Sequence, residues 1–184
     1  MQEVDNVIRI LKETLNAMDR KDSSQIKNLS DQTIHTAAIS QDHDNVIVAV
    51  LVYSIGKIIE REYYKEMDGW NEFYSKLLKN LNQAIDYLEQ GNVEKFRDCE
   101  NRIRKAIADI DSNLREYIED VYKKAQINKA SKIYEHGLSM EMTAELLGVS
   151  LWDVASYIGQ SRSNEIVDQF DAKKRIKIAE DFFK

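Results

Sequence analysis

Apolar side chains recur at steps of three and four residues along most of the chain, which is the period of an α-helix with one buried face. The pattern predicts four helices in the first half of the chain, at residues 3–20, 24–40, 45–65 and 70–90. The third is locally ambiguous, because residues 46–52 are rich in the β-branched side chains typical of strands. The apolar pattern continues to residue 59, however, and no second convincing strand could pair with it, so we expect a buried central helix.

The breaks between these helices contain residues that end one helix and begin the next. They fall at residues 22–24, 44–45, 68–69 and 91–92. Either Asp44 or Asn45 is expected to cap the third helix. Gly91 is suited to ending the fourth helix, and Asn92 can cap its successor, so the sequence predicts a tight helical hairpin there.

Residues 93–136 contain no glycine or proline, and apolar residues recur in them at alternating steps of four and three. These residues are Ile103, Ile107, Ile110, Leu114, Tyr117 and Val121. Such a seam indicates either packing against the fourth helix of one bundle or a coiled-coil-like seam between two copies of the chain. We therefore predict an all-α fold, in which an antiparallel helical bundle at residues 1–122 leads through a long connecting helix to a C-terminal module. We also expect a homodimer.

Residues 123–160 have the pattern of a helix-turn-helix module, centred on MEMTAELLGVSLWDVASYI. The small residue, turn glycine and buried aliphatic residue of that motif correspond to Ala144, Gly148 and Val154. Glycine suits the turn because it adopts a positive φ at no steric cost. Ser139 and Ser150 can cap the two helices, and Asp153 follows Ser150 by three residues, close to a capping box.

The stretch KASKIYEHGLSMEMTAELLGVSLWDVASYIGQ, residues 129–160, resembles the helix-turn-helix of small prokaryotic antitoxin-type DNA-binding proteins. The similar features are the EHG-LSM turn, the AELLGVS segment and an aromatic residue at the start of the last helix. The resemblance implies DNA binding or neutralisation of a toxin. It covers about a sixth of the chain and does not extend to residues 1–122.

The composition suits long helices and limits the area that could contact nucleic acid. The chain has no proline and only six glycines, and its formal charge of −6 argues against a generally basic surface. Residues 1–122 hold 16 Lys and Arg against 23 Asp and Glu, a net of −7, and residues 123–184 hold 10 against 9, a net of +1. The candidate DNA-binding module is therefore close to neutral.

Side chains on the second helix of such a module read DNA bases, and cations beside it contact phosphates. The candidates for contact with nucleic acid or a partner are Lys124, Lys129, Lys132, Ser150, Trp152, Ser156, Tyr157, Gln160 and Arg162. Trp152 and Asp153 stand where a DNA-reading helix usually has basic or amide side chains. Two hypotheses follow. The first is a dimeric DNA-binding regulator or antitoxin-like factor. The second is a scaffold protein whose helix-turn-helix docks a protein partner, which could be part of a larger nucleoprotein assembly.

Nothing in the sequence indicates catalysis or a bound cofactor. There is no phosphate-binding glycine loop, nucleophile elbow or HExxH motif, so we expect neither enzyme activity nor a cofactor. Metal-ligand chemistry is concentrated in His35, Asp42, His43 and Asp44. A polar loop that caps the third helix explains these residues more simply, and we expect no metal. The single cysteine, Cys99, lies in a helical pattern and is expected to be a packing residue.

The sequence predicts neither a signal peptide nor a membrane-spanning segment. Its most apolar stretch, residues 46–59, is shorter than the roughly 20 residues of a membrane helix and is interrupted by Lys57. We expect a cytoplasmic protein that has no membrane partner. The tail at residues 161–184 is predicted to contain a short amphipathic helix with a basic start.

Overall fold

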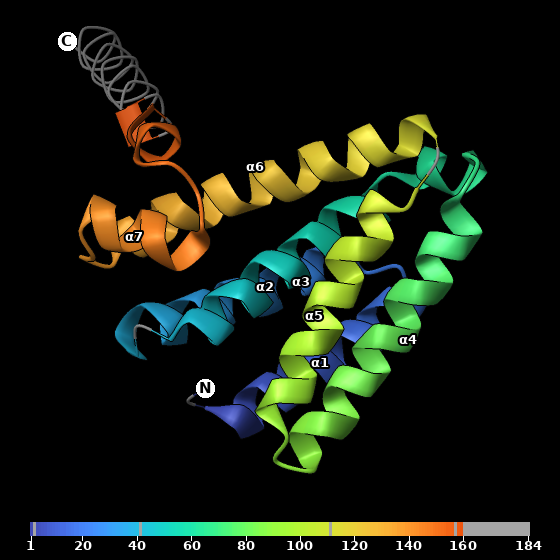
Figure 1. The fold of residues 1–184 in the computed structure, drawn as a ribbon, viewed down its shortest axis with the longest axis horizontal. Helices are drawn as coiled ribbons and strands as arrows, with labels where there is room; N and C mark the ends of the chain where they lie inside the picture. Colours follow the sequence, from blue (N-terminus) through green and yellow to red (C-terminus); the bar gives the residue numbers. More distant parts are fainter. Residues whose placement is uncertain (2, 41, 111, 157, 160–184) are drawn as a thin grey trace, which may run out of the picture.

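The computed structural model describes residues 1, 3–40, 42–110, 112–156 and 158–159, and these form an all-helical fold (Figure 1). The elements are α1 (Val4–Asp19), α2 (Ser23–Ser40), α3 (His43–Glu60), the 3₁₀ helix η1 (Glu62–Glu66), α4 (Trp70–Glu89), α5 (Val93–Ala108), α6 (Asn113–Glu135) and α7 (Met140–Leu147). Residues 151–156 and 158–159 are also helical. No strand occurs among the described residues, so the all-α prediction is confirmed, and residues 46–52 lie within α3.

The predicted caps are confirmed at most helix ends. Gly91 has a φ of 70° after α4, and the Asn92 side chain accepts a hydrogen bond from the Lys95 N–H at 3.0 Å. α4 and α5 therefore form the expected antiparallel hairpin. The cap of α3 is Asp42 and not Asp44 or Asn45, because the helix begins two residues earlier than predicted and the Asp42 side chain accepts from the Asp44 N–H.

The unbroken pattern of residues 93–136 does not form one helix. α5 ends at Ala108, and α6 begins at Asn113 after Ser112, whose hydroxyl accepts from the Leu114 N–H and donates to the Asp68 carbonyl. Serine favours such caps because its hydroxyl replaces a backbone partner. The sequence pattern predicted no break within residues 93–136, so the turn between α5 and α6 was not anticipated.

The apolar seam lies inside a single chain. Ile103, Ile107, Ile110, Leu114 and Val121 are all buried in the main core, and of the seam residues only Tyr117 is exposed. These residues therefore pack in the core of a single chain. They are already covered, so a coiled-coil seam between two copies would require them to leave the core, and the homodimer prediction loses this support.

Two apolar cores organise the described helices. The larger core is formed by α1 to α5 together with the first half of α6. The smaller core joins α2 and α3 to the second half of α6, to α7 and to the last helical residues, through side chains such as Ile34, Ile133 and Val154. α6 thus begins on one core and ends on the other, crossing the molecule in Figure 1. The domain boundary predicted after residue 122 falls within this helix.

α7 and the residues after it form two short helical segments around a glycine turn, which we call the C-terminal helix pair, residues 139–159. Ser139 accepts a hydrogen bond from the Met142 N–H at 3.1 Å, and Gly148 ends α7 with a φ of 63°. The Ser150 hydroxyl accepts from the Asp153 N–H at 3.0 Å and bonds the Asp153 carboxylate at 2.7 Å. The capping predicted from the sequence is confirmed at both helix starts.

We expect Gly148→Ala to lower the free energy of unfolding by about 1 kcal/mol, because a side chain makes the left-handed conformation costly. Among the described residues, no heavy atom lies within 4 Å of a Cβ added at Gly148, so the expected loss of stability reflects the cost of the backbone conformation alone. Gly159→Ala is the matched control, since a Cβ there also meets none of the described residues within 4 Å, but the glycine has no positive φ. Urea denaturation measures both variants, and equal stabilities would contradict the argument.

Candidate interaction sites

Packing of the C-terminal helix pair fixes which of its side chains face outward. Ala144 and Val154 are buried in the smaller core, as predicted for the two positions that flank the turn. Among the described residues of the pair, three large apolar side chains are left exposed, namely Met142, Leu151 and Trp152. Trp152 is 80% exposed, although tryptophan is one of the side chains most often covered in folded proteins. The pair therefore presents an apolar anchor to its surroundings.

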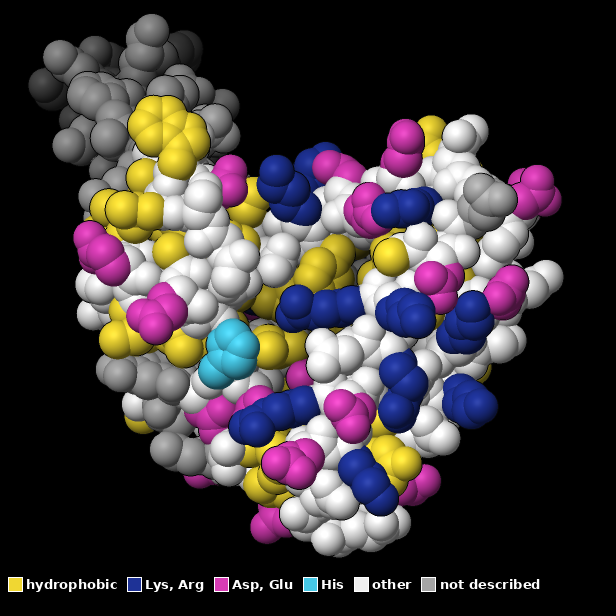
Figure 2. Space-filling view, viewed as in Figure 1, with side chains coloured by type: hydrophobic (Ala, Val, Ile, Leu, Met, Phe, Trp, Pro, Cys, Tyr) yellow, Lys and Arg dark blue, Asp and Glu magenta, His cyan; other side chains and the backbone are white. Residues whose placement is uncertain are grey.

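The same segment contains acidic residues and no cation. Residues 137–159 include Glu141, Glu145 and Asp153 but neither Lys nor Arg. Figure 2 shows this contrast on one face of the molecule: Lys and Arg side chains gather over α5 and α4, and the part formed by α7 is apolar and acidic. Such a surface repels phosphate and favours a positively charged partner.

Lys129 does not lie on the surface, which corrects its predicted role as a contact for nucleic acid. Its side chain is 0% exposed, and its Nζ lies 2.6 Å from an Asp31 oxygen and 4.3 Å from the centre of the Tyr53 ring. Burial lowers the pKa of Lys129 to about 8, against the opposing effect of Asp31. Lys129 is a structural residue that joins α6 to α2 and α3.

The other predicted cations within the described residues have acidic partners. Lys132 pairs with the second Asp31 oxygen at 2.7 Å, and Lys124 pairs with Asp120 at 2.7 Å. Ser150 is exposed but engaged in capping, and Ser156 is exposed. The remaining predicted contacts, Tyr157, Gln160 and Arg162, lie outside the described residues, as does the predicted tail helix.

A polar cluster that was not predicted from the sequence lies where α5 meets α3, with Asp44 and Glu100 buried and Arg97 half-exposed. Arg97 donates two hydrogen bonds of 2.8 Å to Asp44, and this guanidinium lowers the pKa of the Asp44 carboxyl. Glu100 is buried beside them, and its Oε1 has no hydrogen-bond partner among the described residues. Burial, aided by the Asp44 charge, raises the pKa of Glu100 to about 8, although Arg104 and Arg97 oppose the shift. The sequence did contain a signal for Glu100: it lies four residues after Phe96 and three before Ile103, on the buried face of the helix.

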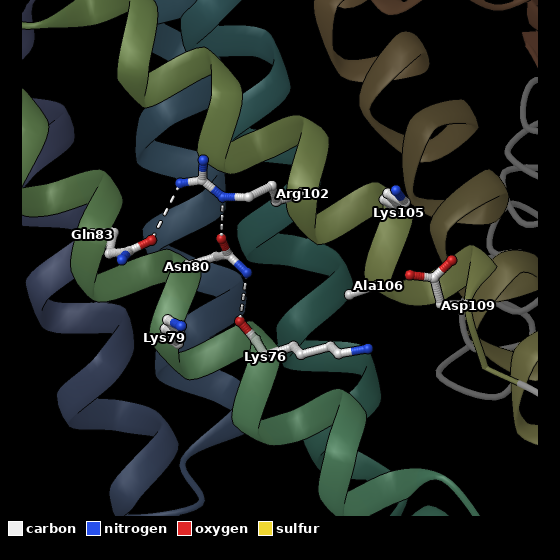
Figure 3. Close-up of a pocket in the computed structure, with 8 residues that line it drawn as sticks. All are labelled: Lys76, Lys79, Asn80, Gln83, Arg102, Lys105, Ala106 and Asp109. Atoms are coloured by element: carbon white, nitrogen blue, oxygen red, sulfur yellow. Dashed lines mark hydrogen bonds between the residues drawn. The ribbon is translucent and has the colours of Figure 1, made fainter.

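A groove with a volume of about 530 Å³ runs between α4 and α5 (Figure 3). Its lining consists of Lys76, Lys79, Asn80, Gln83, Arg102, Lys105, Ala106 and Asp109. Arg102 points from α5 toward α4, where its Nε donates to the Asn80 side chain at 2.8 Å and its Nη2 to Gln83 at 3.2 Å. Four cations and one acid therefore border one groove of an acidic protein.

Of the residues considered as metal ligands, His35, Asp42 and Asp44 have other partners. His35 packs edge-on against His136 with ring centres 5.0 Å apart, and Asp44 is bound to Arg97. Across the described ranges no group of three or more His, Cys, Asp or Glu side chains could hold a metal ion. Cys99 is buried, as expected for a packing residue. None of the described helices combines the length and the apolar character needed to cross a membrane.

No protein-family model matches the chain, and comparisons with curated proteins and with solved structures give no match.

Proposed function

We propose that this chain is a helical protein-interaction module whose C-terminal helix pair docks a partner protein. The observation that carries the proposal is the 80% exposure of Trp152, beside exposed Leu151, in a segment that has no Lys or Arg. Large aromatic side chains commonly supply most of the affinity at protein interfaces, because their burial removes a wide apolar surface from water. Lys129, Lys132 and Lys124 provide little free positive charge for nucleic acid.

The chemistry of this surface indicates the chemistry of its partner. Met142 and Trp152 offer apolar contacts, and the exposed Glu141 and Glu145 add negative charge on α7. A complementary partner presents apolar side chains flanked by Lys and Arg, and a basic amphipathic helix has both features. Opposite charges steer the encounter, and burial of Trp152 holds the complex together.

We expect the chain to bind a synthetic amphipathic helix of Leu and Lys, and not the counterpart in which Glu replaces Lys. Fluorescence anisotropy of the labelled peptides measures both affinities. Trp152→Ser should weaken binding by about thirtyfold, the effect of losing a hot-spot anchor of about 2 kcal/mol. Ile39→Ser is the matched control, since Ile39 is 73% exposed but lies on α2. Equal binding of both peptides, or equal loss in both variants, would count against the proposal.

The same variants can be used with the natural partner. Tagged wild-type chain, Trp152→Ser and Ile39→Ser are purified from the native host, and proteins recovered in stoichiometric amounts are identified. A partner is expected with the wild type and Ile39→Ser and absent with Trp152→Ser. Its contact segment should be basic and apolar. Recovery of nucleic acid without a stoichiometric protein would contradict protein docking.

The second candidate function is DNA binding by the helix pair acting as a helix-turn-helix, in a dimeric regulator or antitoxin-like factor. The left-handed φ of Gly148 and the burial of Ala144 and Val154 favour it, since they reproduce the geometry such a module needs. Filter binding to genomic fragments at two salt concentrations tests this candidate, and sedimentation tests the dimer. DNA binding should weaken steeply with salt if it is carried by phosphate contacts.

A further inference from the structure

We propose that the groove between α4 and α5 binds a small phosphate-bearing molecule. The two helices form a hairpin, so residues spaced three apart on each helix line the same groove. The cations among them are Lys76 and Lys79 from α4, and Arg102 and Lys105 from α5. Ala106 adds little bulk to the lining, which helps to leave space between the longer side chains. This site is separate from the C-terminal helix pair.

Arg102 is oriented without being neutralised. Within the described part of the chain its hydrogen-bond acceptors are the amide oxygens of Asn80 and Gln83 and the Cys99 sulfur, none of which is a carboxylate. The Asn80 side chain is itself fixed in position, because its NH₂ donates to the Lys76 carbonyl at 2.8 Å and Asn80 is only 7% exposed. A guanidinium fixed by neutral groups keeps its charge for a ligand and has lost part of its conformational entropy beforehand.

The charge of the groove favours an anion. Lys79 and Lys105 have no acidic partner among the described residues, and Lys76 is paired with Glu72 at 2.7 Å. Asp109 supplies the one negative charge of the lining. Counting Glu72 with its partner, four cations face two acids, which leaves a net charge of +2. Arg97 shows the contrasting arrangement on α5, since Asp44 already satisfies its charge.

The lining also indicates the kind of anion. It contains no aromatic residue, so it offers no surface on which a nucleobase could stack. Its cationic groups are the Arg102 guanidinium, whose Nη1 remains for a ligand, and lysine ammonium groups, and both kinds suit the oxygens of phosphate. A groove of about 530 Å³ between two helices suits a small molecule better than the backbone of a duplex. Inorganic pyrophosphate is the simplest probe with two phosphate groups.

Calorimetric titration of the full chain with pyrophosphate at low salt tests the site. We expect saturable binding by the wild type, and a loss of about tenfold or more in Lys79→Gln/Lys105→Gln, because two ligand-facing charges are removed. Lys95→Gln/Lys123→Gln removes the same charge from exposed positions outside the groove and should change the affinity less than about twofold. Arg102→Lys keeps the charge but loses the guanidinium that Asn80 and Gln83 hold in place, and should also weaken binding.

Circular dichroism confirms that each variant is folded. Absence of pyrophosphate binding by the wild type would overturn the proposal, and so would equal loss in the two double variants, which would indicate general charge attraction. A titration with duplex DNA separates the sources of phosphate. Binding of the duplex without binding of pyrophosphate would assign the groove to a nucleic-acid backbone and overturn the small-molecule site.

Discussion

Replacing Glu100 with Gln will remove a loss of stability that the wild-type protein suffers as pH rises from acid to mildly basic values. Glu100 is buried on α5 beside Asp44, and burial raises its pKa to about 8. The unfolded chain, in which this side chain is solvated, has an ordinary carboxyl pKa near 4.3. Glutamine has the same shape and no charge to desolvate, so the variant keeps the packing of the site.

The direction of the effect follows from proton binding. Between the two pKa values the folded state holds a proton on Glu100 and the unfolded state does not, so stability falls as pH rises through that interval. The wild type should lose about 3–4 kcal/mol from this group between about pH 5 and pH 8, since one pKa unit corresponds to 1.36 kcal/mol. The lowered pKa of Asp44 acts at more acidic pH and adds little in this interval.

Urea denaturation at several pH values measures the effect. The free energy of unfolding of Glu100→Gln should be nearly flat where that of the wild type declines, and the two should converge toward acidic pH. Glu94→Gln is the control, because Glu94 lies on the same helix and is exposed. Parallel curves for wild type and Glu100→Gln would show that another group controls the pH dependence.

The sequence predicted the helices well because the apolar period is a local property. α1, α2 and α4 agree with their predicted ranges to within a residue or two at each end. The break after α5 was missed because the seam keeps its spacing through it: Ile110 and Leu114 stay buried on either side of the Ser112 cap. Periodicity reports which side chains are buried, and it does not report that the backbone changes direction between them.

The surface roles of charged residues were harder to predict, because they depend on contacts between distant segments. Lys129 follows Ala125 and precedes Ile133 by four residues each, so its place on the buried face was visible in the sequence. Its partner was not, since Asp31 is 98 residues away. The α4–α5 groove is an intermediate case. The hairpin at Gly91 and Asn92 was predicted, but the position of its Lys and Arg side chains along one groove was not.

Asp31→Asn should cost more stability than Lys129→Met, although the two variants break the same ion pair. Without Asp31 the Lys129 ammonium stays buried with no carboxylate, and we expect a loss of about 2–3 kcal/mol. This is less than the cost at a fully buried pair, because the Asp31 side chain is 44% exposed. Methionine is apolar and of similar length, can pack on Tyr53, and should change stability by less than about 1 kcal/mol.

The double variant Asp31→Asn/Lys129→Met distinguishes a lost attraction from a stranded charge. If the stranded ammonium causes the loss, the double variant will regain most of the stability that Asp31→Asn loses. The pH dependence gives a second readout. The pKa of Lys129 is lowered in the folded state, so the unfolded chain binds more protons between about pH 8 and pH 10.5, and this group's contribution to stability rises with pH there. The deficit of Asp31→Asn should therefore shrink as Lys129 loses its proton, and a deficit that stays constant with pH would mean that Lys129 is not its source.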